Sequence, residues 1–237
     1  MGEFRSVTNG RERWHGGARA PRHRHDRAYA AIVLSGGYEE AGSRGRFFLQ
    51  PGDVLVHDAF EAHLNRFEKG GAEILNIGLA RRAICGGKGL VADPDLIARK
   101  AEEDALEAEE ALLVQFVPAG AEPGDDWPDA LARRLALNPD CRLADWAAEN
   151  ALAPETLSRG FGRRYGVTPL AFRAEARARL AFAAITGAEV GLSDIAAATG
   201  FADQAHMTRA VTALTGASPA AWRRRSNFFK TANGRLR

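Results

Sequence analysis

Residues 200–224 read GFADQAHMTRAVTALTGASPAAWRR, and this stretch repeats the pattern of an earlier part of the chain. Residues match at an offset of 49 positions before a turn and of 50 positions after it, so one extra residue near the turn separates the copies. The matched pairs are Leu143 with Leu192, Asp145 with Asp194, Ala147 with Ala196, Leu157 with Met207, Arg159 with Arg209, Gly166 with Gly216, and Pro169 with Pro219. The chain therefore encodes one helical unit twice.

Each copy predicts two helices around a short turn. In the first copy, helices are expected over residues 143–150 and 154–165, since Pro154 suits a first turn and Gly166 ends a helix. In the second copy, Gly200 separates a helix that begins near Leu192 from one that Asp203 caps. The side chains expected to face inward are Leu143, Trp146, Ala147, Leu157, Phe161 and Tyr165 in the first copy, and Leu192, Ile195, Ala196, Met207, Val211 and Leu214 in the second.

The outward side of the second helix in each copy is polar and basic. Arginine can donate two hydrogen bonds to guanine, and glutamine can pair with adenine, so these residue types suit the edges of bases. A single amphipathic helix with outward arginines is usually only a solvated surface. Two copies that share buried positions, glycines and outward arginines favour a helix-turn-helix that reads DNA.

The stretch 143–222 resembles the DNA-binding domain of the AraC/XylS family of bacterial transcription regulators. In that family, two helix-turn-helix units joined by a long helix enter successive major grooves of DNA. The resemblance implies a joining helix over residues 174–186 and recognition helices roughly 34 Å apart, one turn of DNA. The DNA-contacting positions that it implies are Glu155, Thr156, Ser158, Arg159 and Arg163 in the first unit, and Gln204, Ala205, His206 and Arg209 in the second.

Several residues depart from the pattern of that family. Ala205 stands where the family often has serine, and Met207 and Val211 replace phenylalanines, which predicts softer packing of the second unit. Gly160 and Gly162 each cost about 1 kcal/mol of helix propensity. The first unit is therefore expected to read DNA less tightly, or to become ordered only on binding.

The charge of the chain is divided along its length. Residues 139–237 hold 14 Lys and Arg against 8 Asp and Glu, a net charge of +6, whereas residues 1–138 hold 18 against 22, a net charge of −4. The basic part is therefore the part expected to meet nucleic acid. The end of the chain, 226–237, reads as a basic tail whose expected state is frayed, with phosphate contact as the alternative.

Length and cysteine usage indicate a two-domain protein of a reducing compartment. A chain of 237 residues, 46% of them hydrophobic, is long enough for two folded domains and a connection. Cys85 and Cys141 are expected to be free thiols, with a redox switch between them as the less favoured alternative. The sequence shows neither a membrane-spanning run nor a signal peptide, so a cytoplasmic protein with no membrane partner is expected.

The N-terminal part reads as β structure. Short apolar or alternating runs at 28–34, 46–50, 53–57, 63–67 and 73–79 are separated by glycine-rich turns, a pattern typical of a sandwich or barrel. The order of features, an HRH triplet, a glycine turn and then QPGDVLVHDAFEAH, resembles the cupin barrel, a double-stranded β-helix that many regulators of the same family carry. The sequence therefore predicts an α+β protein with a cupin-like N-terminal domain over residues 1–90.

The histidines of this part form a candidate pocket or metal site. A strand would point His23 and His25 to one face, and the cupin resemblance implies that His63 is the later histidine and that Tyr29 stands in place of a carboxylate. Three histidines alone suit zinc with an open fourth position, so a divalent metal is one alternative, although no cofactor is required. The other is that these side chains line an effector pocket or lie on the surface. Asp58 and Phe60 depart from the proline and glycine of the cupin motif.

An acidic segment, 91–138, connects the two parts. Residues 91–130 contain 12 Asp and Glu and only two cations, and their apolar positions predict one long helix over 94–117. This helix is expected either as a strut on the barrel or, as the resemblance implies, as the contact of a homodimer. A linker and a short helix over 129–137 then lead into the DNA-binding domain at 139–225.

The features together predict a DNA-binding transcription regulator, not an enzyme, controlled by a small-molecule effector in the barrel. Its partners would be an operator in double-stranded DNA, the effector, a second copy of the chain and RNA polymerase. Two other hypotheses remain open. The barrel could be a cupin-type metalloenzyme or metal sensor that uses His23, His25 and His63, or the chain could bend DNA constitutively and sense nothing.

Overall fold

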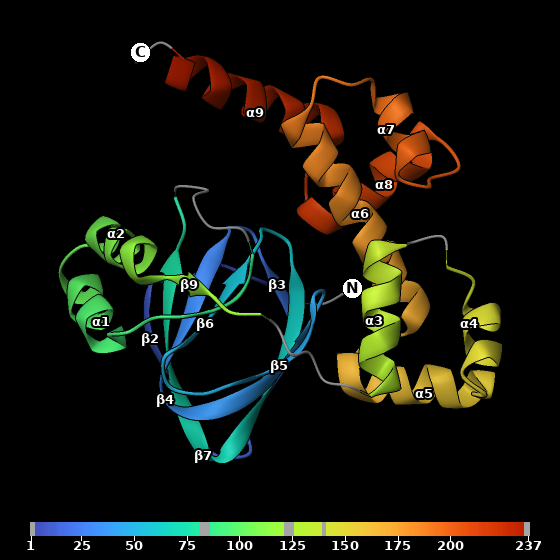
Figure 1. Cartoon of the computed structure of the whole chain (residues 1–237). Coiled ribbons are helices and arrows are strands. Elements are labelled where there is room, and N and C mark those ends of the chain that lie inside the picture. Colours follow the sequence, from blue (N-terminus) through green and yellow to red (C-terminus); the bar gives the residue numbers. More distant parts are fainter. Residues whose placement is uncertain (1–2, 81–85, 121–125, 139–140, 235–237) are drawn as a thin grey trace.

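The computed structural model describes residues 3–80, 86–120, 126–138 and 141–234, with side chains described up to residue 226. The fold is α+β: a curved sheet in the N-terminal part is followed by a helical C-terminal domain (Figure 1). The strands are β1 Glu3–Arg5, β2 Gly10–Trp14, β3 Arg19–His25, β4 Tyr29–Gly42, β5 Gly45–Leu49, β6 Asp53–His57, β7 Ala62–Gly78, β8 Gly87–Leu90 and β9 Val117–Pro118.

Two long strands, β4 and β7, form the centre of the sheet. Turns were expected at Gly36-Gly37 and Gly70-Gly71, but both strands run through these glycines as irregular positions of one antiparallel ladder. Gly36 has φ +70°, and a Cβ there would lie 2.0 Å from the carbonyl oxygen of Gly71. Glycine at these positions therefore lets the two strands approach closely and bend. The prediction of turns was wrong because these glycines serve a close strand contact instead.

The hydrogen-bonded strands lie in the order β1-β3-β7-β4-β6-β8-β9, with β2 added to β7 and β5 added to β4. Among the described residues this path is open and does not close into a ring. Strand β3 is antiparallel to β7 and places His23 directly opposite His63. The sheet thus brings together two histidines that lie 40 positions apart in the chain.

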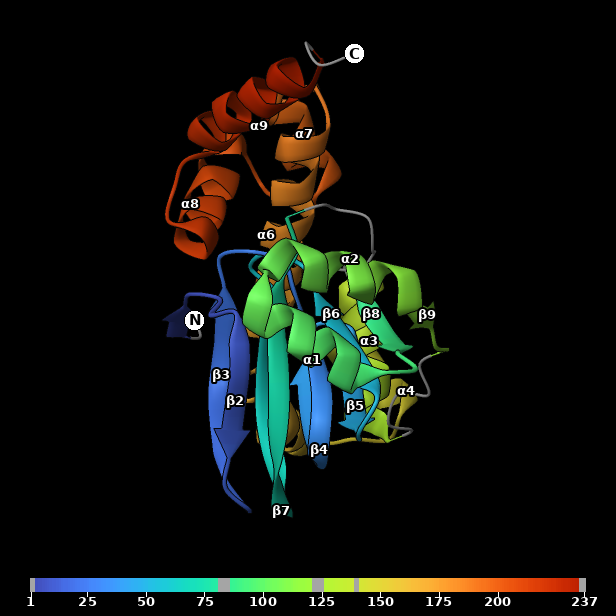
Figure 2. The ribbon, with the colours of Figure 1, turned by 90° about the vertical axis from the view of Figure 1, so that its left-hand side faces the viewer.

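The acidic segment forms two helices rather than one. α1 spans Pro94–Glu103 and α2 spans Ala105–Gln115, and Asp104 between them is extended, with φ −151° and ψ 127°. The carboxylate of Asp104 accepts hydrogen bonds from the backbone N–H groups of Leu106 and Glu107 and so caps α2. Both helices cover one face of the sheet (Figure 2), where Ile97 and Leu112 are buried.

The C-terminal part contains seven helices among the described residues, and four of them are the helices that the repeat predicts. The seven are α3 Trp127–Leu137, α4 Leu143–Glu149, α5 Pro154–Tyr165, α6 Pro169–Gly187, α7 Leu192–Ala198, α8 Gln204–Thr215 and α9 Pro219–Gly234. The joining helix α6 begins five residues before the expected start at 174, because Thr168 caps it and Pro169 suits its first turn. α9 runs to Gly234, so residues 226–234 continue a helix instead of fraying.

The helical domain packs against the sheet on the side away from α1 and α2 (Figure 1). Phe60, in the loop between β6 and β7, packs against Phe182 of α6 and Trp222 of α9, with ring centroids 5.1 and 5.6 Å away. Its φ of 63° is the left-handed conformation that favours glycine. Across the described residues, none of the helices is both long and apolar enough to span a membrane.

Candidate nucleic-acid interface and effector pocket

The two recognition helices, α5 and α8, present their predicted DNA-contacting residues to solvent. All nine positions are exposed in the structure: Glu155, Thr156, Ser158, Arg159, Arg163, Gln204, Ala205, His206 and Arg209. The expected inward residues of these two helices are buried: Leu157, Phe161, Tyr165, Met207, Val211 and Leu214. The side chains of the polar and basic face of each helix are therefore accessible to a partner. Contact of these nine residues with DNA stays a prediction.

Packing explains one of the two glycines inside the first recognition helix, Gly160. A Cβ at Gly160 would lie 2.4 Å from the indole ring of Trp127, so only glycine lets α3 approach α5 this closely. Gly162 has no such constraint, because the nearest atom to a Cβ there is a carbonyl oxygen at 3.8 Å. Gly166 ends α5 in the left-handed conformation, with φ 71°.

The second unit is closed by a cap at each end of α8. The carboxylate of Asp203 accepts a hydrogen bond from the backbone N–H of His206 at 2.6 Å, as the sequence predicts. Gly216, with φ 77°, ends the helix. The indole N–H of Trp222 donates to the hydroxyl of Thr215 at 2.7 Å, which fixes α9 against the last turn of α8.

Arginines of the sheet reach the C-terminal carbonyls of both recognition helices. Arg22 donates to the carbonyl of Tyr165 at 3.2 Å, and Arg66 donates to the carbonyl of Arg164 at 3.0 Å. Arg24 donates to the carbonyl of Ala213 in α8 at 3.2 Å. The last carbonyls of a helix lack partners within the helix and carry partial negative charge, so guanidinium groups stabilise them.

Arg22 also forms a buried ion pair across the interface. Its guanidinium lies 2.6 Å from the carboxylate of Glu175 in α6, and both side chains are largely buried. A second polar contact joins Arg46 of β5 to Asp129 of α3 at 2.8 Å. The sheet and the helical domain are therefore held together by charged groups as well as by apolar packing.

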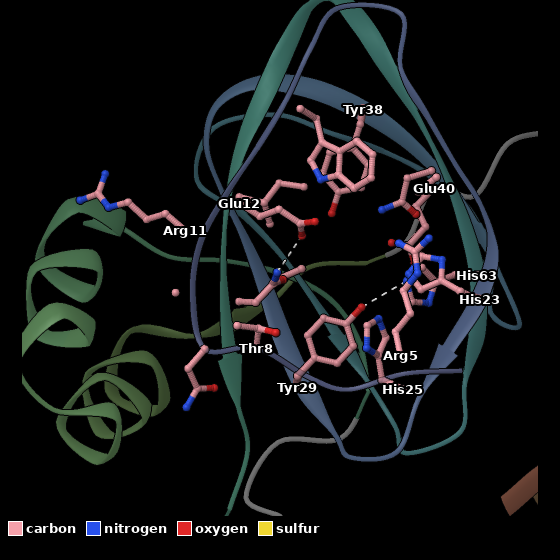
Figure 3. A pocket seen from close by; sticks show the side chains of 18 of the residues that line it. Arg5, Thr8, Arg11, Glu12, His23, His25, Tyr29, Tyr38, Glu40 and His63 are labelled. Carbon is pink, nitrogen blue, oxygen red and sulfur yellow. Dashed lines mark hydrogen bonds between the residues drawn. The ribbon is translucent and has the colours of Figure 1, made fainter. Parts of the chain in front are cut away.

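A pocket lies inside the curved sheet (Figure 3). It has a volume of about 330 Å³, and His23, His25, Tyr29 and His63 all line it. Their binding of an effector or a metal stays a prediction. The Tyr29 hydroxyl lies 3.2 Å from Nε2 of His63, and Nδ1 of His23 lies 2.8 Å from the carbonyl oxygen of Pro21. Further lining residues are Arg5, Trp14, Tyr38, Glu40 and Asn65.

Burial keeps the histidines of the pocket uncharged at neutral pH. Desolvation lowers the pKa of His23 to about 4 and the pKa of His63 well below its ordinary value. It also lowers the pKa of His25, and nearby Arg5 adds to this effect. A neutral imidazole offers one N–H donor and one lone pair, so the pocket can bind polar ligands or a metal through nitrogen.

The chemistry of the histidines fits the metal that the cupin resemblance implies. One nitrogen each of His23, His25 and His63 lies within 4.8 Å of the others. The Pro21 carbonyl accepts from Nδ1 of His23, which leaves Nε2 as the donor toward a metal. Tyr29 hydrogen-bonds His63 and so cannot replace the missing carboxylate without losing that bond.

Sequence reasoning missed two residues of this region, Glu40 and His57. One oxygen of Glu40 lies 3.5 Å from Nε2 of His57, whose ring stacks on Tyr29 with centroids 4.6 Å apart. Burial raises the pKa of Glu40 well above its ordinary value, and burial lowers that of His57 to about 3. The pairing of Tyr29 with His57 depends on strand register, which the sequence does not reveal.

Cys141 lies between α3 and α4, and it is a buried free cysteine among the described residues. Cys85 lies outside the described residues, so the redox switch between the two thiols stays a prediction.

A helix-turn-helix domain model matches residues 146–225. No curated protein matches the chain. Among solved structures, unsaturated fatty acid-bound ToxT from Vibrio cholerae is 10% identical, with a TM-score of 0.40, covering 92% of this chain and 96% of that one. The C-terminal domain of AraT, a response regulator from Geobacillus stearothermophilus, is 22% identical, with a TM-score of 0.37, covering 42% of this chain and 88% of that one.

A probable AraC family transcriptional regulator from Rhodopseudomonas palustris is 18% identical, with a TM-score of 0.38, covering 40% of this chain and 93% of that one. The class of the C-terminal part follows from the matched model. Residues 146–225 form a helix-turn-helix domain, and such a domain implies DNA-binding transcription regulation.

Proposed function

We propose that the chain is a transcription regulator whose affinity for an operator changes when a small molecule binds in the pocket of the sheet. The observation that carries this proposal is the alternation along β3. His23 and His25 line the pocket, whereas Arg22 and Arg24 on the other side of the same strand bond the ends of the two recognition helices. One strand therefore touches both the pocket that we propose binds the effector and the helices that we propose read DNA.

The alternation suggests how the signal would travel. Successive side chains of a strand point to opposite faces, so a shift of the backbone that moves the histidines also moves the arginines. A hydrogen bond of 3.2 Å is lost when its atoms separate by a few tenths of an ångström. A ligand that binds one position of β3 better than another would thereby bias how α5 and α8 are held.

The first experiment selects preferred sites from random duplex DNA with the full chain and then measures operator affinity. Small molecules that raise the melting temperature of the full chain are added to the same assay. We expect at least one of them to change the operator Kd about fivefold or more, and we expect His63→Ala to abolish this change. His15→Ala, an exposed histidine outside the pocket, is the matched control.

Two outcomes contradict the proposal in different ways. Binding without any sequence preference would remove the base-reading role of α5 and α8. Sequence-specific binding that no stabilising compound alters would indicate a constitutive DNA-binding protein, the alternative in which the pocket senses nothing.

A homodimer is part of the proposal. α1 and α2 pack one face on the sheet and leave Leu106 and Val114 exposed on the other, which supports a contact between two copies. Light scattering of Leu106→Glu and Val114→Glu variants tests it, with a dimeric wild type and monomeric variants expected. Contact with RNA polymerase rests on the resemblance alone.

A further inference from the structure

We propose that Glu40, His57 and His63 form a binding site for a divalent transition-metal ion such as Zn²⁺. These residues come from β4, β6 and β7, and one potential ligand atom of each lies within 4.8 Å of the others. The site differs from the His23, His25 and His63 group that the cupin resemblance implies, because it contains a carboxylate and shares only His63 with that group. It does not depend on DNA binding.

Buried nitrogen atoms with no partner point to a ligand at this place. Glu40, His57 and His63 are 2%, 2% and 1% exposed. Nδ1 of His63 has no hydrogen-bond partner among the described residues, and Nε2 of His57 forms no hydrogen bond either, although a carboxyl oxygen of Glu40 lies 3.5 Å away. A buried polar atom without a partner destabilises the folded state, so two such atoms in one cluster require an explanation. A metal ion that accepts both lone pairs removes this cost.

The neighbouring contacts suit metal ligation. The Tyr29 hydroxyl lies 3.2 Å from Nε2 of His63, and if Nε2 carries the proton and donates to Tyr29, the lone pair of Nδ1 is free for a metal. The rings of His57 and His63 lie side by side, with centroids 4.5 Å apart. Tetrahedral Zn²⁺ holds its ligand atoms about 3.3 Å apart, given bond lengths near 2.0 to 2.1 Å, so small side-chain rotations complete the site.

The donor set indicates which ions would bind. Two imidazoles and one carboxylate are ligands of Zn²⁺ and of other first-row divalent ions, whereas Mg²⁺ prefers oxygen ligands throughout. The carboxylate of Glu40 would bind in its ionised form, and the charge of the ion would offset the cost of burying it. Three protein ligands leave a fourth position open on the tetrahedral ion.

The site lies in the wall between two cavities. Glu40 and His63 line the pocket inside the sheet (Figure 3), whereas His57 lines a groove of about 750 Å³ between the sheet and α6. Arg179 and Phe182 of α6 line the same groove. An ion bound by these three residues would therefore connect the inner pocket with the helical domain.

The experiment titrates the full chain, stripped with a chelator, with Co²⁺ and Zn²⁺ in the absence of DNA. Visible absorption reports Co²⁺ coordination, calorimetry gives the Zn²⁺ affinity, and elemental analysis gives the stoichiometry. We expect one ion per chain and no comparable binding of Mg²⁺. Glu40→Gln and His57→Gln are each expected to weaken binding at least about tenfold, since even partners outside the ligand shell are worth this much.

Matched controls separate this site from the other candidates. Glu12→Gln changes a carboxylate that lines the same pocket but belongs to neither cluster, and His25→Gln changes only the cupin-like group. Glu12→Gln is expected to bind within about threefold of the wild type. His25→Gln reports where the ion lies, because a loss as large as that in Glu40→Gln would place the ion in the cupin-like group. His15→Ala and His206→Ala test adventitious binding by exposed histidines.

Three results would overturn the proposal: no stoichiometric binding by the wild type, a loss in His25→Gln as large as that in Glu40→Gln, or a loss confined to the exposed histidines. Far-ultraviolet circular dichroism checks that each variant folds. If His57→Gln does not fold, the comparison of metal affinity between Glu40→Gln and its near-isosteric control Glu12→Gln tests the proposal. Failure of metal binding leaves the DNA-binding proposal standing, because the two assays share no component except the chain.

Discussion

Replacement of Asp129 by asparagine removes a buried charge at the junction of sheet and helices. Asp129 is fully buried and accepts from Arg46 at 2.8 and 3.2 Å and from the Tyr165 hydroxyl at 2.6 Å. Breaking one side of a buried ion pair costs about 3 to 5 kcal/mol. Glu39 and Asp126 lie 3.2 and 3.0 Å from the guanidinium and keep part of its charge compensated. We therefore expect a loss near the lower end, about 3 kcal/mol.

Urea unfolding followed by tryptophan fluorescence measures this loss. With a slope of about 3 kcal/mol per molar, the midpoint should fall by about 1 M. The control is Asp145→Asn. Asp145 forms an exposed ion pair with Arg142, with Nε and the carboxylate oxygen 3.9 Å apart, so the free energy of unfolding should change by no more than about 0.5 kcal/mol. A loss below about 1 kcal/mol in Asp129→Asn would show that the pair does not hold the two domains together.

Three further outcomes are expected. Arg159→Ala and Arg209→Ala should each weaken specific operator binding by about 1 to 3 kcal/mol and relax base preference, and equal losses on random DNA would refute base reading. In urea unfolding, Gly160→Ala should destabilise the protein by about 1 to 3 kcal/mol, because its methyl group clashes with the indole of Trp127. Gly162→Ala should stabilise it by up to about 1 kcal/mol, because alanine favours the helix. The reverse order of the two stabilities would contradict the packing. Phe60→Gly should lose about 2 to 4 kcal/mol, because interdomain ring contacts outweigh the left-handed strain it relieves, and a gain in stability would show the opposite.

The helices of the C-terminal domain were predictable because their signals are local. Asp203 and Gly166 bound α8 and α5 as expected, since a cap is decided within a few residues. The break at Asp104 was missed, although an aspartate that can cap the next turn was visible in the chain. In the long helix expected over 94–117, apolar periodicity outweighed that local signal.

The sheet was less predictable, because its contacts depend on register. The alternation of His23 and His25 predicted that both point to one face of a strand, and both line the pocket. Glu40 and His57 were missed, because a strand pattern does not say which strand lies beside it. Arg22 and Arg46 look like solvated charges in the sequence, and only the position of α6 and α3 reveals their buried partners.

The side chains of β3 contact the pocket on one side and the helices on the other, and this limits which sequence changes the strand can tolerate. A point substitution alters one side chain on one side of the strand. Insertion of a single residue directly after Arg22 would reverse the sides of the residues that follow, placing Arg24 in the cavity and both imidazoles against the helix ends. In natural relatives that keep both roles, the length of this strand should therefore vary less than its composition.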